Sequence, residues 1–388
     1  MKKLIIFSIL SYLLFTINTS TADQNLEQKE NILKIGVLLP LSGKFQNIGE
    51  SFLKSIQLAL FEVGNKNIKI YPKDSKANAL DSYKSAKEFE EMNINIVLGP
   101  IFYESIEELG KINNITFISF TNKATNIPKN VISFGVSVDS QIAILKEYFD
   151  KTEISKTLIL YPNSEYNLQS ESIKKKDILK FYRTYSYDTN PKKITAQIEK
   201  ITKYQERKRD LERRKKILEK SDLYKDQNEL KKLEQKHTLG KVNFDSVFVL
   251  DFGERLKSVL SSFIFSDVTS EEVNFFTLNQ WFDETLFTES AMQNLYFPSI
   301  NFKNLKKFNK KYEKTFGEKP IKVSILAYDA LGLVYYCWFN NNKDFNTSQL
   351  YNKNGFKGLH GKFVIKNNLS KQTLKIYKVS KEKFISVY

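Results

Sequence analysis

The sequence predicts an α/β protein of two lobes, each lobe a mainly parallel sheet covered by helices. At 388 residues the chain exceeds the length at which one hydrophobic core usually stops growing, so two lobes are expected. The apolar run Ile35–Leu39 is bounded by Pro40 and Gly43, which is typical of a short strand buried on both faces. Apolar residues then recur at helical spacing from Glu50, and this strand–loop–helix order repeats along the chain.

Short apolar runs and helical patterns alternate through both expected lobes, which implies right-handed crossovers between parallel strands. The first lobe is expected to have strands at 68–71, 94–98 and 116–120, and helices at 82–92 and 105–111. The chain is expected to cross to the second lobe near 131–138. There, helices are predicted at 141–149 and 255–263, and strands at 157–161, 181–187, 246–250 and 273–278.

The C-terminal part is expected to return to the first lobe near 295–298, with helices at 302–316 and 324–338. The turn-forming sequence KNNLSK predicts a terminal hairpin of strands 363–365 and 373–379. The first lobe would then comprise 33–137 plus 297–340, and the second 138–296 plus 341–388.

A highly charged insertion interrupts the second lobe at 192–236. It contains 16 Lys or Arg and 9 Asp or Glu residues, and it has no Gly or Pro. Apolar residues recur at the seven-residue spacing of coiled coils, at Tyr204, Leu211 and Leu218 and then at Leu223 and Leu230, and Leu233 adds the intermediate position. This pattern predicts a helical hairpin broken near 221–222, with a first arm about 40 Å long. The insertion is either a solvated structural addition or, as we favour, a surface for a protein partner.

The N-terminus has the features of a cleavable signal peptide at 1–22. A basic start precedes the apolar run Leu4–Thr16, and Ser20–Ala22 offers small residues for cleavage. A membrane anchor is the alternative, but about 13 apolar residues fall short of the roughly 20 that span a bilayer. No cysteine follows the run, so a lipoprotein acylation site is missing, and a periplasmic protein without an integral membrane segment is expected.

The net charge indicates which partners to expect, and the cysteine content indicates whether a disulfide or a reactive thiol is expected. The net charge is +16, or +14 without Lys2 and Lys3, which favours anionic partners such as lipid headgroups or acidic wall polymer. Nucleic acid is not expected as a partner, because the protein is predicted to be exported. The only cysteine, Cys337, excludes an intramolecular disulfide and is expected to be a buried thiol rather than a nucleophile.

Three stretches resemble type I periplasmic binding proteins of the leucine-binding family. They are GVLLPLSG at 36–43 with the helix after it, NINIVLGPIFYESIEELGKINNITFISFTNKAT at 93–125, and SILAYDALGLVYY at 324–336. The insertion, together with HTLGKVNFDSVFVLDFGERLKSV at 237–259, looks like the alphaproteobacterial penicillin-binding protein activator branch. This resemblance implies a two-lobed fold that closes on ligands and a role in regulating a peptidoglycan synthase. The chain departs from the lipoprotein relatives because it lacks the lipid-bearing cysteine.

Ligands of such α/β folds lie at the carboxyl ends of the strands. We therefore expect a ligand site made by residues that follow the predicted strands, namely Ser42, Tyr103, Ser119, Thr121, Asn122, Thr125, Tyr161, Asp251 and Glu254. For an amino acid, Asp251 and Glu254 would bind the ammonium group, while hydroxyl and amide groups would bind the carboxylate. Tyr103, at a position where the family pattern has a small hydroxyl residue, either stacks on a ligand or fills the cleft. Candidate partner-binding residues of the insertion are Arg207, Arg209, Arg213 and Arg214.

An enzymatic function is not expected, and neither is a cofactor or a metal. The two histidines, His237 and His360, have no sequence neighbours typical of a triad or a metal site. The GxSxG and GK[ST] motifs are absent. Two functions remain: a regulator of peptidoglycan synthesis that contacts a synthase, which we favour, or the solute-binding component of an amino-acid ABC transporter, which would contact its permease.

Overall fold

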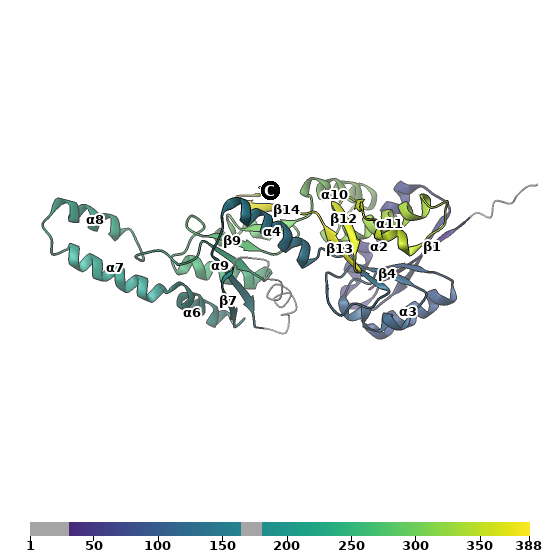
Figure 1. Ribbon diagram of the computed structural model, residues 1–388, viewed down its shortest axis with the longest axis horizontal. Helices are drawn as coiled ribbons and strands as arrows, with labels where there is room; N and C mark the ends of the chain where they lie inside the picture. The colour runs from purple at the N-terminus through teal and green to yellow at the C-terminus, as the bar shows by residue number, and fades with distance from the viewer. Residues whose placement is uncertain (1–30, 164–180) are drawn as a thin grey trace, which may run out of the picture.

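The computed structural model describes residues 31–163 and 181–388, which form two sheets with helices on their faces (Figure 1). The predicted signal peptide at 1–22 lies outside the described residues. The first sheet has the strand order β11-β12-β13-β5-β4-β3-β1-β2. Its strands are β1 (Leu33–Leu39), β2 (Ile68–Asp74), β3 (Ile96–Leu98), β4 (Thr116–Ser119), β5 (Val131–Ser133), β11 (Phe356–Lys357), β12 (Lys362–Lys366) and β13 (Leu369–Gln372).

Strand β1 is buried on both faces, as its apolar run predicts. Val37 and Leu39 pack in the cluster that contains α2 (Gln46–Val63) and α11 (Ile325–Phe339). Leu38, on the opposite face, packs in the cluster of α3 (Ala79–Glu91) and the 3-10 helix η2 (Tyr103–Lys111). Strands β1 to β5 are parallel to their neighbours, so their carboxyl ends meet at one edge of the sheet.

The second sheet has the strand order β15-β14-β10-β9-β8-β6-β7. Its strands are β6 (Thr157–Pro162), β7 (Phe181–Tyr187), β8 (Ser246–Val249), β9 (Asn274–Thr277), β10 (Tyr296–Ser299), β14 (Lys375–Ser380) and β15 (Lys383–Ser386). Helices α4 (Val138–Thr152) and α9 (Gly253–Phe265) cover this sheet, whereas α10 (Phe302–Phe316) lies with α2 in the first lobe. The structure thus confirms two lobes with mostly parallel sheets.

The C-terminal segment differs from the prediction. The turn at Asn367 and Asn368, both with positive φ, joins β12 to β13, so residues 369–372 are already a returning strand rather than part of the loop. Strand β13 then pairs with β5 in the first sheet, and β14 pairs with β10 in the second. The predicted hairpin of 363–365 with 373–379 is therefore wrong, as is the placement of 356–372 in the second lobe.

Three segments of chain connect the lobes, after β5, after β10 and after β13. Gln372 joins two of them, because its Nε2 donates to the Gly135 carbonyl at 2.8 Å and its Oε1 accepts from Ser137 N at 3.3 Å. Gln372 is buried, so these hydrogen bonds are shielded from water. Two connecting segments that are far apart in sequence are therefore joined by hydrogen bonds of the Gln372 side chain.

The charged insertion forms three helices, α6 (Pro191–Thr202), α7 (Tyr204–Leu218) and α8 (Tyr224–Glu234). The predicted continuous first arm is wrong, because Lys203 has a positive φ of 53° and ends α6. Helix α6 packs on α9, while α7 and α8 form a hairpin that projects from the second lobe, at the left of Figure 1. We call residues 204–236 the arm.

Candidate functional site

A cavity of about 420 Å³ is lined by residues of both lobes. Gln141 of α4 and Val323 and Leu326 near the start of α11 form part of the lining, but most first-lobe residues follow β3, β4 and β5, and most second-lobe residues follow β8 and β9. These are the carboxyl ends of parallel strands, where α/β folds usually bind ligands. The principal side chains on the two walls are Phe102, Tyr103, Phe120, Thr121 and Asn122 from the first lobe, and Phe252, Asn279, Gln280, Trp281 and Asp283 from the second.

The first-lobe wall contains three of the predicted ligand-binding residues, Tyr103, Thr121 and Asn122. The Tyr103 ring is half-buried, and Lys123 Nζ lies 4.4 Å from its centroid. The Thr121 carbonyl accepts hydrogen bonds from Ser133 Oγ at 2.7 Å and Gly135 N at 2.9 Å. These bonds attach the loop after β4 to the end of β5.

The second-lobe wall is organised by Asn279, which is 5% exposed. Its Oδ1 accepts from Trp281 N at 2.9 Å and Ser299 Oγ at 2.8 Å, and its backbone N donates to Gln141 Oε1 at 2.8 Å. Its buried Nδ2 has no hydrogen-bond partner among the described residues. A buried amide donor without a partner costs free energy, so an acceptor that reached Nδ2 would stabilise this wall.

Trp281 and Phe282 follow with positive φ angles of 49° and 57°. Bulky residues adopt this left-handed conformation at a cost, and surrounding contacts must hold it. Here the Asn279 side chain holds Trp281 N, and Lys322 Nζ donates to the Phe282 carbonyl at 2.6 Å. These two hydrogen bonds therefore fix the conformation of the loop after β9, which forms part of the cavity wall.

Asp251, predicted to bind an ammonium group, has structural partners instead. It is 1% exposed, and it accepts hydrogen bonds from the Tyr187 hydroxyl and from Phe252 N at 2.8 Å. Arg255 donates to the same carboxylate with Nη2 at 2.7 Å and Nε at 2.9 Å. Burial, together with the hydrogen bond to Asp251, raises the pKa of Tyr187. Asp251 does not line the cavity, and its charge is already balanced.

Four other predicted residues, in addition to Ser42, also lie outside the cavity wall. Glu254 has a side chain that is 87% exposed and pairs with Lys257 at 3.0 Å. Ser119 Oγ is buried and donates to the Pro100 carbonyl at 2.8 Å. Thr125 is exposed on its loop, and Tyr161 packs against the second-lobe core.

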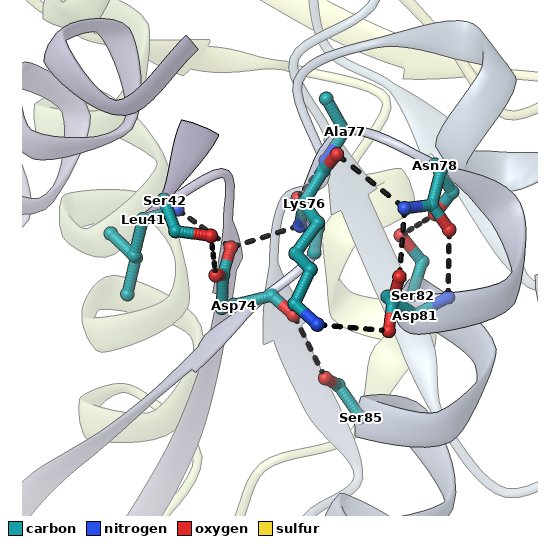
Figure 2. Close-up of polar contacts among 10 residues, drawn as sticks. Leu41, Ser42, Asp74, Lys76, Ala77, Asn78, Asp81, Ser82 and Ser85 are labelled. Carbon is teal, nitrogen blue, oxygen red and sulfur yellow. Dashed lines mark hydrogen bonds and ion pairs between the residues drawn. The ribbon is translucent and has the colours of Figure 1, made fainter. Parts of the chain in front are cut away.

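Ser42 belongs to a polar network that connects the ends of β1 and β2. Figure 2 shows the Asp74 carboxylate accepting hydrogen bonds from Ser42 Oγ, from Leu41 N at 2.8 Å and from Lys76 N at 2.9 Å. Burial favours the neutral acid, but these hydrogen bonds prevail and lower the pKa of Asp74. Ser42 therefore fixes a loop of the first lobe and does not line the cavity.

Sequence reasoning missed the residues that follow β9. The strand 273–278 was predicted, and Asn279, Gln280 and Trp281 come directly after it. The same rule that selected the ends of the other strands would have selected these three residues. Gln141, on α4, carried no such signal because only tertiary packing brings its Oε1 to Asn279 N.

The four arginines of the arm differ in their burial and in their hydrogen-bond partners. Arg207 is 7% exposed, and its guanidinium donates to the Ser266 carbonyl at 3.2 Å, the Asp267 carbonyl at 3.0 Å and Thr238 Oγ1 at 2.6 Å. Burial lowers the pKa of Arg207, although Asp267 acts in the opposite direction. Arg207 anchors the arm to the second lobe, so its guanidinium is not available to a partner.

The other three arginines lie further along α7. Arg214 makes a fork with Glu229 of α8, with two N–O distances of 2.9 Å. Arg213 pairs with Asp210 at 2.7 Å on the outer surface, and Arg209 is exposed beside it. Leu211, Leu218 and Leu233 form the buried core of the hairpin, as their spacing predicts, whereas Leu223 is 67% exposed at the turn.

The reactive side-chain types of the described residues are placed as follows. They contain no group of three or more His, Cys, Asp and Glu side chains that could hold a metal ion. His360 is buried against Asp329, and Cys337 is buried with its pKa raised by burial to about 11. The Cys337 thiol is therefore protonated at neutral pH and a poor nucleophile.

Across residues 31–163 and 181–388, none of the helices combines the length and the apolar character that membrane spanning requires.

Comparisons at the sequence level found no relative, since no family model and no curated protein matches the chain. Solved structures do match. LivJ, the branched-chain amino acid transporter substrate binding protein of Streptococcus pneumoniae in complex with isoleucine, has a TM-score of 0.57 and 16% identity over 92% of this chain and 99% of its own. The leucine binding protein LivK of Thermotoga maritima has a TM-score of 0.59 and 12% identity over 92% and 98%.

The C-domain of LpoA from Haemophilus influenzae, a regulator of PBP1A, matches equally well. Its TM-score is 0.59 at 15% identity, over 92% of this chain and 100% of the domain. At such identities the similarity shows the fold alone. This chain therefore has the two-lobed fold of type I periplasmic binding proteins, which transporter binding proteins and LpoA share.

Proposed function

We propose that this chain is a non-catalytic periplasmic binding protein that regulates a peptidoglycan synthase by contact through its arm. The observation that carries the proposal is the arm itself, a helical hairpin that projects from the second lobe (Figure 1). Its presence on a binding-protein fold provides a surface beyond the cleft.

The arm is built to keep its direction. The buried Arg207 fixes its base, because three acceptors on 238–267 hold the guanidinium. The leucine cluster of Leu211, Leu218 and Leu233 and the Arg214–Glu229 fork hold α7 against α8. Pre-organisation of this kind reduces the entropy lost on binding, which favours a role in recognition.

The outer face of α7 is strongly basic. It presents Lys208, Arg209, Arg213 and Lys216, with Lys220 just beyond the helix end, against two acidic residues, Glu212 and the Asp210 that pairs with Arg213. Such a face complements an acidic protein surface and would speed the encounter with it. LpoA, which shares the fold, is a regulator of PBP1A, and this supports a synthase as the partner here.

The test is capture of a purified peptidoglycan synthase by the immobilised exported protein. Arg209→Glu with Lys216→Glu should weaken capture about tenfold or more, because attraction becomes repulsion. Lys307→Glu with Lys310→Glu on α10 makes the same charge change in the first lobe and should leave capture unchanged. Equal capture by all three proteins would contradict the proposal.

Removal of the arm gives a second form of the test. Helix α6 must stay, because Ile194 and Ile198 are buried in the second-lobe core, so the shortened chain replaces only 209–235 with a Gly-Ser linker. It retains Arg207 and its partners and should fold with the same far-ultraviolet circular dichroism, less the arm's helical signal. Loss of synthase capture is expected.

The cavity favours a second candidate function, the solute-binding component of an amino-acid ABC transporter. The specific observation is the buried Asn279 Nδ2 without a partner on the cavity wall. A ligand at 100 times its dissociation constant should add about 2.7 kcal/mol to stability, which a thermal-shift screen of amino acids detects. Asn279→Ala should reduce such a shift and Glu254→Ala should not, whereas a screen without any shift would count against this function.

A further inference from the structure

The end of the arm exposes apolar side chains that its own packing does not use. Ile217 is 56% exposed, Leu223 is 67% exposed and Tyr224 is 84% exposed. All three lie within eight residues of sequence at the turn between α7 and α8, the outermost part of the arm in Figure 1. We call Ile217, Leu223 and Tyr224 the tip.

Basic side chains surround the tip. Residues 213–225 contain six Lys or Arg and two Asp or Glu. Arg213 and Arg214 pair with Asp210 and Glu229. In the part of the chain that the structure describes, the lysines at 215, 216, 220 and 225 have no acidic partner within ion-pair distance. The tip thus combines exposed apolar groups with unneutralised positive charge.

This combination points to an anionic lipid surface as the occupant. Tyrosine and leucine are suited to the boundary between headgroups and acyl chains, and lysines near that boundary are attracted to anionic headgroups. A specific protein interface buries about 1,200 Å² or more in total, which the three side chains of a narrow turn do not provide by themselves. A bilayer surface, in contrast, can accept a few inserted side chains.

We infer that the tip inserts Leu223, Tyr224 and Ile217 into the headgroup region of an anionic membrane, with the neighbouring lysines against lipid phosphates. Helix α7 has 15 residues, so it would hold the lobes about 20 Å from the bilayer surface. Attachment of this kind is peripheral and reversible, because so few apolar groups enter the lipid. It needs neither a lipid anchor nor a spanning helix. Lys216, Ile217 and Lys220 also belong to the outer face of α7, whereas Leu223 and Tyr224 lie outside that face.

The test is co-sedimentation of the exported protein, its N-terminus verified by mass spectrometry, with vesicles. Vesicles of phosphatidylcholine with phosphatidylglycerol should bind the protein, and vesicles of phosphatidylcholine alone should bind it weakly. Raising the salt concentration should weaken the binding to the anionic vesicles, because screening reduces the attraction of the lysines. Replacement of Leu223 and Tyr224 by Ser should lower the partition coefficient about tenfold.

Matched variants distinguish vesicle binding by the tip from nonspecific binding by any exposed apolar side chain. Phe61→Ser on α2, a residue 65% exposed in the first lobe, should leave vesicle binding unchanged. Lys220→Glu with Lys225→Glu should weaken binding only to anionic vesicles. With Tyr224→Trp, vesicles should shift tryptophan emission to shorter wavelength, beyond the change given by the native Trp281 and Trp338.

Three outcomes would overturn the inference. These are no binding to anionic vesicles, equal binding to neutral vesicles, or equal losses in the tip and Phe61 variants. Failure here would be distinguishable from failure of the proposed function, because synthase capture is measured without lipid and the replacements at Leu223 and Tyr224 leave the outer face of α7 unchanged. A tip variant that loses vesicle binding but keeps synthase capture would confirm that the two surfaces act separately.

Discussion

Single side chains of this protein have roles that their charge alone does not reveal. Arg207 belongs to the most basic stretch of the sequence, yet it is buried, whereas its neighbour Arg209 faces solvent. Thr238, which accepts from Arg207, donates in turn to Asp267 at 2.6 Å. The guanidinium is therefore part of an internal network that joins the arm to the lobe, and its deletion would leave buried acceptors unpaired.

We expect Arg207→Met to lower the free energy of unfolding by about 3 kcal/mol, because buried hydrogen bonds to a charged group are lost. Arg209→Met is the matched control and should change it by less than about 0.5 kcal/mol. Urea denaturation followed by circular dichroism measures both. Equal stability of the two variants would show that the Arg207 network does not contribute to folding.

Tyr187 predicts a dependence of stability on alkaline pH. Burial and the hydrogen bond to Asp251 raise its pKa above the ordinary value of 10.0. The folded state thus keeps the proton where an unfolded tyrosine loses it, so this stabilisation is complete below about pH 10 and declines as the pH rises further. Tyr187→Phe should make the free energy of unfolding fall less steeply above about pH 10.

The control for this measurement is Tyr224→Phe, since Tyr224 is 84% exposed. At neutral pH we expect Tyr187→Phe to be about 1 kcal/mol less stable than the native protein, because Asp251 loses one hydrogen bond. Chemical denaturation at several pH values gives both results. Parallel pH profiles for all three proteins would remove Tyr187 as the source of the dependence.

At the scale of elements, one charged stretch of sequence divides into two structural units. Helix α6 belongs to the second lobe, because Ile198 is fully buried and Thr195 Oγ1 lies 3.0 Å from Ser262 Oγ of α9. Helices α7 and α8 have their own small cluster around Leu211. The two units should therefore unfold differently, since stability follows local packing.

We expect Ile198→Ala to lower the global free energy of unfolding by about 3 kcal/mol, as a core cavity does. Leu211→Ala should mainly open the arm, so amide hydrogen exchange in α7 and α8 should rise while the global transition changes little. Exposed Lys208→Ala is the control for both measurements. Cooperative loss of the whole fold on Leu211→Ala would show that arm and lobe are one folding unit.

At the scale of the molecule, a hydrogen bond beside the cavity connects the two lobes. Lys322 belongs to the 3-10 helix η5 (Lys322–Ser324), which Ser324 joins to the first lobe through Ser55 Oγ at 2.8 Å. Lys322 Nζ donates to the carbonyl of Phe282. The Phe282 ring centroid lies 5.6 Å from that of Phe297 in β10 of the second lobe. This hydrogen bond therefore bridges the lobes.

Lys322→Met should loosen the lobes and increase the radius of gyration measured by small-angle X-ray scattering. The physical reason is that the bond fixes a loop whose residues Trp281 and Phe282 have unfavourable positive φ angles. Exposed Lys319→Met, three residues earlier, is the control and should scatter like the native protein. An unchanged radius in both variants would place the control of lobe separation in the connecting segments instead.

The sequence by itself determined the features that depend on neighbours along the chain. The apolar run of β1, the alternation of strands and helices and the leucine spacing of the arm are all local patterns, and the structure has each of them. The two-lobed α/β class follows from such patterns because burial of one face imposes a period on the residues that form it.

Only the tertiary structure decided which distant residues meet. Strand β13 pairs with β5 across more than 200 residues, and no local signal distinguishes that partner from a hairpin with β14. Asp251 was predicted to bind a ligand, but its carboxylate accepts hydrogen bonds from Arg255 and Tyr187 instead. Asn279 is positioned in part by Gln141, whose Oε1 accepts a hydrogen bond from Asn279 N. Pairing partners and burial arise from contacts between distant segments, so periodicity along the chain does not encode them.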